Sequence, residues 1–266
     1  MTAVLTAGFL AFCVYPAWAQ EVKSSALGIT PLQLQKIRSG PVVVLDSRSS
    51  LQYYWGHIPG ARHLGDWKQY TVTINGVPGL LNRDPRFLAE KLANLGLSRS
   101  QTLVIYGDAK DPWRTDGRFF WMFEFLGFQH VLMLNGGYAA WTRADLEVER
   151  GNVADFAPTP WNPGDIRFNA AANADQTWIL QHLHTPDLVI LDNREAKEYH
   201  GATPFGAVRG GRIPGAIHLN WKEFFDPQGA LKSLPNLQQI LDRYGIREGK
   251  TIVVYCTGGV RSGSNR

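Results

Sequence analysis

The strongest constraint on the fold is an internal duplication that relates the two halves of the 266-residue chain. Three segments, PVVVLDSR (41–48), HIPGARHL (57–64) and TLVIYG (102–107), return in the same order as DLVILDNR (187–194), RIPGAIHL (212–219) and TIVVYC (251–256). The offsets are 146, 155 and 149 residues, and the larger middle value fits an insertion around residues 202–210. A period near 150 residues indicates duplicated domains rather than a solenoid of short repeats.

Each half alternates short apolar runs with stretches of helical character. Continuous apolar strands separated by helices are typical of a parallel sheet that is covered on both faces. We therefore expect an α/β protein with two tandem domains, residues 27–150 and 173–266, joined by a linker at 151–172. The expected strands are 42–45, 103–106, 131–134, 188–191 and 251–255, and the expected helices are 85–95, 119–126 and 237–244.

The N-terminal residues 1–19 are nearly all apolar and carry no charged side chain. Ala17-Trp18-Ala19 has the small-x-small form of a signal-peptidase site, which predicts a cleaved signal peptide and a periplasmic or secreted protein. A signal peptide usually has a Lys or Arg near its start, and none lies near Met1. The alternative is an N-terminal membrane anchor. Cleavage would remove Cys13 and leave Cys256 alone in an oxidising compartment, where a lone thiol suggests a reactive role.

Composition limits the partners. The chain is 44% hydrophobic and 19% charged, which excludes a disordered protein. Two cysteines exclude a disulfide scaffold and a cysteine-rich zinc site, and the histidines show no metal-ligand spacing. The net charge of +4 without a long Lys/Arg run suits small anionic ligands and does not favour nucleic acid. We expect no metal, no cofactor, no nucleic-acid partner and no membrane association after cleavage, while the oligomeric state stays open.

Cys256 is the principal candidate for chemistry. It ends an apolar strand and precedes the loop Thr257, Gly258, Gly259, Val260, Arg261 and Ser262. In parallel sheets, ligands bind at the carboxyl ends of the strands. Two glycines allow successive N–H groups to point inward as an anion-binding nest, and Arg261 adds positive charge, so the thiolate form is favoured. A buried structural cysteine is the alternative.

These motifs resemble the rhodanese (sulfurtransferase) family. The resemblance rests on CTGGVRS after a strand, LDNRE, RIPGAIHL, and the first-half marks LDSR, HIPGARHL and LNGGYAAW (134–141), and it covers residues 27–266. It implies two tandem rhodanese-like domains of which the first is inactive, in agreement with Gly107 at the position that Cys256 holds in the second half. It also implies that Cys256 accepts a sulfane sulfur as a persulfide and passes it to cyanide or a thiol.

The donor stays open between thiosulfate and 3-mercaptopyruvate. Thr257 and Gly258 are neutral, and Arg261 stands where both family patterns usually have Thr. Arg261, Arg194 and Arg212 are candidate binding residues for an anionic donor. For Arg194 the alternative is a surface ion pair with Glu195 or Glu198. Asp46 and Asp192 are expected to cap their loops rather than to act as acids, and the IPGA segments are expected to form structural turns.

Other functions remain as alternatives. The chain could be a noncatalytic persulfide carrier or binding module, a truncated inactive homologue, or a redox-sensing thiol protein. A cysteine phosphatase or arsenate reductase is less favoured, because those enzymes use Cys-x5-Arg and this loop is Cys-x4-Arg. Ten residues follow Cys256, whereas 34 separate Gly107 from Trp141, so we expect the second domain to be incomplete and the 266-residue form to have low activity and stability.

Overall fold

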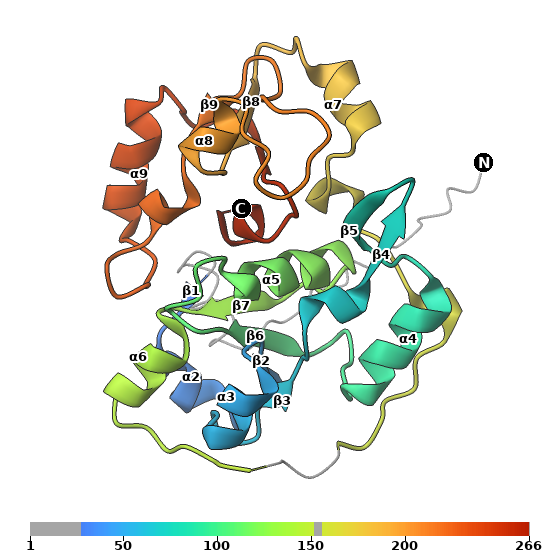
Figure 1. Ribbon diagram of the computed structural model, residues 1–266. Helices are drawn as coiled ribbons and strands as arrows, with labels where there is room; N and C mark the ends of the chain where they lie inside the picture. The colour runs from blue at the N-terminus through green and yellow to red at the C-terminus, as the bar shows by residue number, and fades with distance from the viewer. Residues whose placement is uncertain (1–27, 152–155, 266) are drawn as a thin grey trace, which may run out of the picture.

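The computed structural model describes residues 28–151 and 156–265 (Figure 1). The expected signal peptide at residues 1–19 lies outside these residues. Within them, no helix is both long enough and apolar enough to cross a membrane. The chain folds into two α/β units that stack against each other, with α5 of the first unit between them (Figure 1).

The first unit is built on a parallel sheet, and the described residues form it from five strands in the order β1-β7-β6-β2-β3. Consecutive residues of each strand point to opposite faces, so Val43 and Leu45 pack on one face and Val44 packs on the other. The strands are β1 (Gly28–Ile29), β2 (Val42–Asp46), β3 (Arg62–His63), β6 (Thr102–Tyr106) and β7 (Val131–Leu134).

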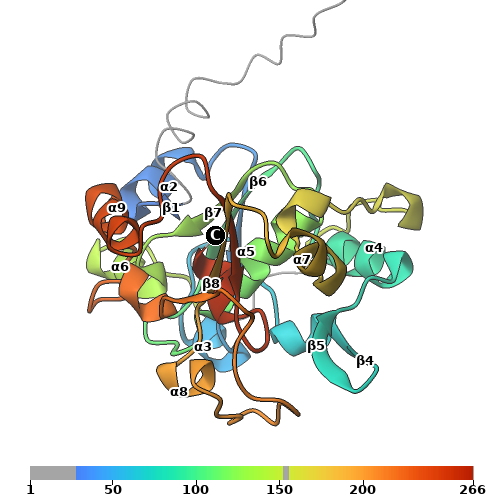
Figure 2. The same ribbon diagram turned by 90° about the horizontal axis from the view of Figure 1, so that it is seen from above.

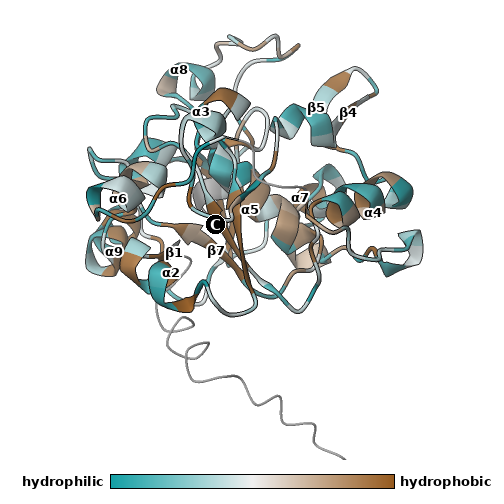
Figure 3. Cartoon of the chain, turned by 90° about the horizontal axis from the view of Figure 1, so that it is seen from below, coloured by the Kyte–Doolittle hydropathy of each residue, from teal (hydrophilic) through white to brown (hydrophobic). Residues whose placement is uncertain are grey.

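Helices cover both faces of this sheet. Leu34, Tyr53 and Trp141 bring α2, α3 and α6 onto one face, whereas Leu88 and Phe119 bring α4 and α5 onto the other. Figure 3 colours the ribbon of β7 as hydrophobic, as expected of a strand that is covered on both faces. The helices are α2 (Pro31–Ile37), α3 (Ser50–Trp55), α4 (Pro85–Asn94), α5 (Thr115–Phe125), α6 (Gly137–Arg143) and the 3-10 turn η1 (Trp67–Tyr70).

The second unit repeats this plan. Its described sheet is parallel, has the strand order β10-β8-β9 and packs against α9 through Leu191, Leu219 and Ile240. The elements are α7 (Gln176–His182), β8 (Leu188–Asp192), α8 (Ala196–Tyr199), β9 (Ile217–His218), η4 (Trp221–Phe224), α9 (Leu234–Arg243), β10 (Thr251–Tyr255) and η5 (Arg261–Asn265). The expected α/β class with two parallel-sheet domains is confirmed.

The segment between the units follows the surface of the first. The indole N–H of Trp161 donates to the Leu97 carbonyl (2.7 Å), and that of Trp121 donates to the Ala172 carbonyl (2.9 Å). The segment holds two 3-10 turns, η2 (Pro163–Asp165) and η3 (Ala170–Ala172). The linker boundaries 151–172 remain a prediction.

A hairpin that the sequence reading did not predict joins η1 to α4. It consists of β4 (Thr71–Ile74) and β5 (Val77–Leu81), which pair antiparallel. Asn75 and Gly76 connect them with φ values of 50° and 77°, as the Asn-Gly turns of tight hairpins require. The hairpin brings Gly79 to the base of α5, where its carbonyl accepts a hydrogen bond from Arg118 (2.9 Å).

The two units meet along α5. Both ribbon views place the C-terminal segment against this helix (Figure 1, Figure 2). A Cβ atom on Gly263 of η5 would overlap the carbonyl oxygen of Gly117 in α5, so the backbones touch without an intervening side chain. At the far end of the contact, Arg114 donates to the Gly229 carbonyl (2.7 Å), and the Leu231 N–H donates to the Asn135 side chain (2.6 Å).

Candidate active site

Cys256 follows directly after β10, at the carboxyl end of that strand. β10 pairs in parallel with β8 so that Tyr255 lies opposite Asp192. Cys256 is a free, half-buried thiol, and it opens into a cavity of about 1350 Å³ that both units line. The structure therefore places the predicted nucleophile at the sheet edge where parallel α/β proteins bind ligands.

The loop after Cys256 curls around the sulfur. Gly259 has a φ of 68°, a left-handed conformation that favours glycine, and Val260 and Ser262 are buried. The Ser262 hydroxyl donates to the Cys256 sulfur (Oγ to Sγ, 3.5 Å). Among the described residues, no carbonyl or side chain accepts a hydrogen bond from the N–H groups of residues 257–260. Those donors have no acceptor within the described protein and are available to a ligand.

A buried ion pair sets the shape of this loop. The Arg261 guanidinium donates to both carboxylate oxygens of Glu198 (2.7 and 2.9 Å), and the Thr257 hydroxyl donates to the same carboxylate (2.5 Å). Glu198 and Arg261 are 1% and 2% exposed. Glu198 comes from α8, so the pair ties the start and the end of the loop to a second element. Glu198 is a site residue that the sequence reading considered only as a partner of Arg194.

The electrostatics of the pair follow from its contacts. Burial by itself raises the pKa of Glu198, but the hydrogen bonds from Arg261 and Thr257 outweigh it and lower the pKa to about 2. Burial lowers the pKa of Arg261, yet the bonds to Glu198 and the nearby Cys256 sulfur raise it above its ordinary value overall. Both groups are charged at neutral pH, so the positive charge expected of Arg261 is balanced by Glu198.

Arg194 is held in a scaffold network. Its guanidinium donates to both oxygens of Asp192 (2.9 and 2.6 Å) and to the Gly211 carbonyl (2.7 Å). Tyr255 donates its hydroxyl to the same carboxylate (2.7 Å). Asp192 also accepts from the Arg194 backbone N–H (3.0 Å), which confirms its predicted role as a loop cap. The expected alternative pairing with Glu195 or Glu198 is replaced by this pair with Asp192.

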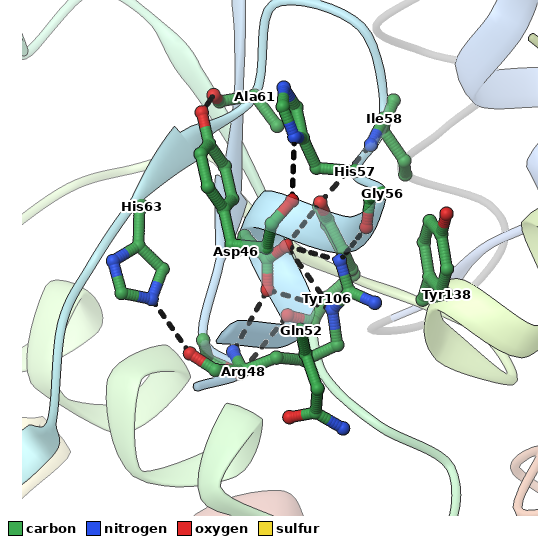
Figure 4. Close-up of polar contacts among 12 residues, drawn as sticks. Asp46, Arg48, Gln52, Gly56, His57, Ile58, Ala61, His63, Tyr106 and Tyr138 are labelled. Atoms are coloured by element: carbon green, nitrogen blue, oxygen red, sulfur yellow. Dashed lines mark hydrogen bonds and ion pairs between the residues drawn. The ribbon is translucent and has the colours of Figure 1, made fainter. Parts of the chain in front are cut away.

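The first unit contains the same network without a thiol (Figure 4). Arg48 donates to Asp46 (2.6 Å) and to the Gly56 carbonyl (2.7 Å), and the Tyr106 hydroxyl donates to Asp46 (2.5 Å). Asp46 accepts the Arg48 backbone N–H (2.8 Å), so its predicted capping role is also confirmed. A network that recurs around a strand end with Gly107 in place of cysteine is structural in origin.

The last predicted donor-binding residue, Arg212, does not line the cavity at Cys256, although its neighbour Ile213 does. Arg212 is exposed, and its guanidinium stacks over the ring of Tyr199 (4.3 Å from Cζ to the centroid). The IPGA segments form the expected turns, with Ala61 N–H bonded to Ile58 (2.9 Å) and Ala216 N–H to Ile213 (3.1 Å). Donor binding by Arg194 and Arg212 remains a prediction. No group of three or more potential metal-binding side chains occurs in the described ranges.

One cation of the cavity comes from the first unit and was not predicted. Arg118 in α5 lines the cavity together with Cys256, Gly258 and Gly259. Its signal in the sequence is a positive charge directly before the apolar run of α5, but only the contact between the units brings it near the sulfur.

Comparison with known proteins identifies the family to which this fold belongs. The profile of the Rhodanese-like domain matches residues 30–144 and 175–266. The chain belongs to the rhodanese family. It is 35% identical to a thiosulfate sulfurtransferase of Azotobacter vinelandii over 91% of this chain and 87% of that protein.

Two Escherichia coli comparisons agree. A 3-mercaptopyruvate sulfurtransferase of strain K12 is 30% identical over 81% of this chain and 74% of its own length. The crystal structure of SseA, described as a 3-mercaptopyruvate sulfotransferase with the rhodanese fold, superposes with a TM-score of 0.75 at 27% identity. That superposition covers 90% of this chain and 91% of SseA.

Proposed function

We propose that the chain is a sulfurtransferase that moves a sulfane sulfur from a small anionic donor to a thiophilic acceptor through a persulfide on Cys256. The observation that carries the proposal is the Cys256 thiol at the end of β10, within a loop whose N–H groups at residues 257–260 have no acceptor in the described chain. Membership of the rhodanese family and the names of the relatives support the same chemistry.

The reaction consists of two displacements at sulfur. In the first, the Cys256 thiolate attacks the outer sulfur of thiosulfate, a Cys–S bond to that sulfur forms, the S–S bond of thiosulfate breaks, and sulfite leaves with the electron pair. In the second, cyanide attacks the outer sulfur of the persulfide, thiocyanate leaves, and the Cys256 thiolate is restored. Atoms and charge balance in each step, and the reacting form of Cys256 is the thiolate.

The loop supplies the groups that stabilise these species. The N–H groups of residues 257–260 would stabilise the anionic persulfide and the departing anion, and Ser262 donates to the sulfur that they surround (3.5 Å). The Glu198–Arg261 pair holds the loop in place (2.7 Å). Both thiosulfate and 3-mercaptopyruvate suit this site. With 3-mercaptopyruvate, a C–S bond breaks instead, and the pyruvate enolate leaves and takes up a proton.

Intact mass measurement tests the proposal. Incubation with thiosulfate or 3-mercaptopyruvate should add one sulfur atom, about 32 Da, which cyanide then removes. Cys256→Ser should form no adduct, whereas Cys13→Ser should form it normally. An adduct that resists both cyanide and thiols would identify a persulfide carrier instead. The absence of any adduct with either donor would contradict both functions.

We also propose that the protein is exported to the periplasm or secreted, on the basis of the apolar residues 1–19 and the Ala17-Trp18-Ala19 site. Expression in a bacterial host should yield a mature protein that begins at Gln20. N-terminal sequencing of the periplasmic fraction checks this. Retention of Met1 in a membrane pellet would favour the membrane-anchor alternative.

A further inference from the structure

Arg118 differs from the other buried arginines. Arg48, Arg114 and Arg261 each pair with a buried carboxylate, at 2.6, 2.9 and 2.7 Å. Arg118 is 7% exposed, and within the described residues its guanidinium hydrogen bonds go to two backbone carbonyls, Gly79 (2.9 Å) and Gly258 (3.5 Å). A buried guanidinium without a counter-charge is costly, because burial removes its hydration.

The charge of Arg118 is felt at the nucleophile. Burial lowers the pKa of Arg118 to about 10, and the nearby Cys256 sulfur acts in the opposite direction. Arg118 is still cationic at neutral pH, so it presents near the Cys256 sulfur a positive charge that no carboxylate of the described residues pairs with. The faces of Trp121 and Trp67 lie beneath the guanidinium, at 4.6 and 5.6 Å from Cζ to the ring centroids, and limit its movement.

The catalytic loop is shaped to admit this side chain. A Cβ atom on Gly259 would overlap Nη1 of Arg118, so another residue at that point of the loop would displace the guanidinium from this position. Gly259 also has the φ of 68° that favours glycine. Arg118 and the loop therefore fit together across the boundary between the units, and the cavity that they line extends to Cys256.

We propose that Arg118, which belongs to the unit without a thiol, binds the anionic end of the sulfur donor and makes the site selective for anionic donors. The sulfonate of thiosulfate and the carboxylate of 3-mercaptopyruvate both offer oxygens to the donor fork of a guanidinium. The ligand supplies the negative charge that Arg118 lacks. This inference rests on the proposed sulfur transfer, and its test separates the two.

The first measurement does not need sulfur transfer. The rate of Cys256 alkylation by anionic iodoacetate is divided by the rate with neutral iodoacetamide in a Cys13→Ser background. Arg118→Gln should lower this ratio about tenfold, the effect of one lost charge-assisted hydrogen-bond partner. The matched control is Arg86→Gln, which removes an exposed arginine of α4 that does not line the cavity and should leave the ratio unchanged.

The second measurement follows the reaction. Arg118→Gln should raise the KM for thiosulfate about tenfold while kcat changes less, because a ground-state contact to the donor is removed. Arg118→Lys keeps the positive charge, so its KM for thiosulfate should lie between that of the wild type and that of Arg118→Gln. Circular dichroism shows whether Arg118→Gln folds. If it does not, the KM for thiosulfate of Arg118→Lys is compared with that of the wild type, and a raised KM supports the proposal. A merely structural Arg118 would change stability without changing the alkylation ratio.

The outcomes distinguish the two proposals. Persulfide formation with an unchanged alkylation ratio and an unchanged KM in both Arg118 variants would overturn the role of Arg118 and leave sulfur transfer intact. A lowered alkylation ratio in Arg118→Gln, with no persulfide in the wild type, would uphold the anion site and overturn the proposed function.

Discussion

At the scale of single residues, the site depends on two buried arginines, of which Arg261 has a carboxylate partner and Arg118 has none among the described residues. Arg261 is neutralised by Glu198, so its contribution is to hold the loop (2.7 Å). Arg118 has carbonyl partners in the described structure and keeps its charge for a ligand. The two arginines therefore have different roles, because Arg261 holds the loop after Cys256 and Arg118 lines the cavity.

Glu198→Gln should destabilise the protein. The substitution leaves Arg261 buried with a neutral partner, and breaking a buried pair costs about 3–5 kcal/mol. Urea denaturation at pH 7 measures the free energy of unfolding. Asp187→Asn is the control, because the pair of Asp187 with Lys250 is exposed (2.9 Å) and such pairs contribute about 0–1 kcal/mol. Equal losses in the two variants would contradict the assignment.

The same pair predicts an acid dependence. The pKa of Glu198 is about 2 in the folded state against an ordinary 4.5, so its stabilisation is fully present above about pH 4.5 and is lost as pH falls toward 2. The difference in unfolding free energy between wild type and Glu198→Gln should therefore shrink between pH 5 and pH 2, roughly the window that these pKa values define. A constant difference across this range would refute the depressed pKa.

The sequence predicted some site residues and not others for a physical reason. Cys256, Ser262 and Arg261 are local to a strand end and were found from the strand and the glycines after it. Glu198 and Arg118 reach the same loop through tertiary contacts, 63 residues from Arg261 and 140 from Gly258. Such contacts leave no spacing in one sequence, so both roles required the structure.

At the scale of elements, the contact between α5 and η5 controls the site. Gly117 and Gly263 let the two backbones touch, and this closeness brings Arg118 one residue further along α5 to the catalytic loop. The sequence predicted this helix from residue 119, whereas it begins at Thr115. Its first turn contains Asp116 and Arg118, which are charged although they are buried, so no apolar pattern reveals the start of the helix.

Gly263→Ala should separate α5 from η5. The added methyl group would overlap the Gly117 carbonyl oxygen, and overpacking of this kind costs about 1–3 kcal/mol. We expect a lower melting temperature and faster alkylation of Cys256 by iodoacetamide, because the loop moves away from α5. Gly164→Ala is the control, since a Cβ there meets nothing within 4 Å. Unchanged melting and alkylation in Gly263→Ala would refute the close contact.

At the scale of the whole molecule, the duplication was readable because strand cores and turns repeat in order. The expected strands at 131–134 and 251–255 match β7 and β10. The hairpin β4–β5 was missed because its strands are largely exposed and were not sought as buried apolar runs. Its Asn75-Gly76 turn was the available signal. The stacking of the two units was not predictable, because it depends on matching surfaces rather than on local pattern.

The backbone contact between Gly117 and Gly263 has a consequence for how the two copies can diverge. A duplicated segment is free to drift only where the other copy makes no use of it. Here the unit without a thiol lines part of the cavity beside Cys256. Substitutions at Gly117 or Arg118 should therefore be as poorly tolerated as substitutions beside Cys256. The half without a thiol therefore takes the place that a second subunit takes in an oligomeric enzyme, and the peptide chain joins it to the half with Cys256.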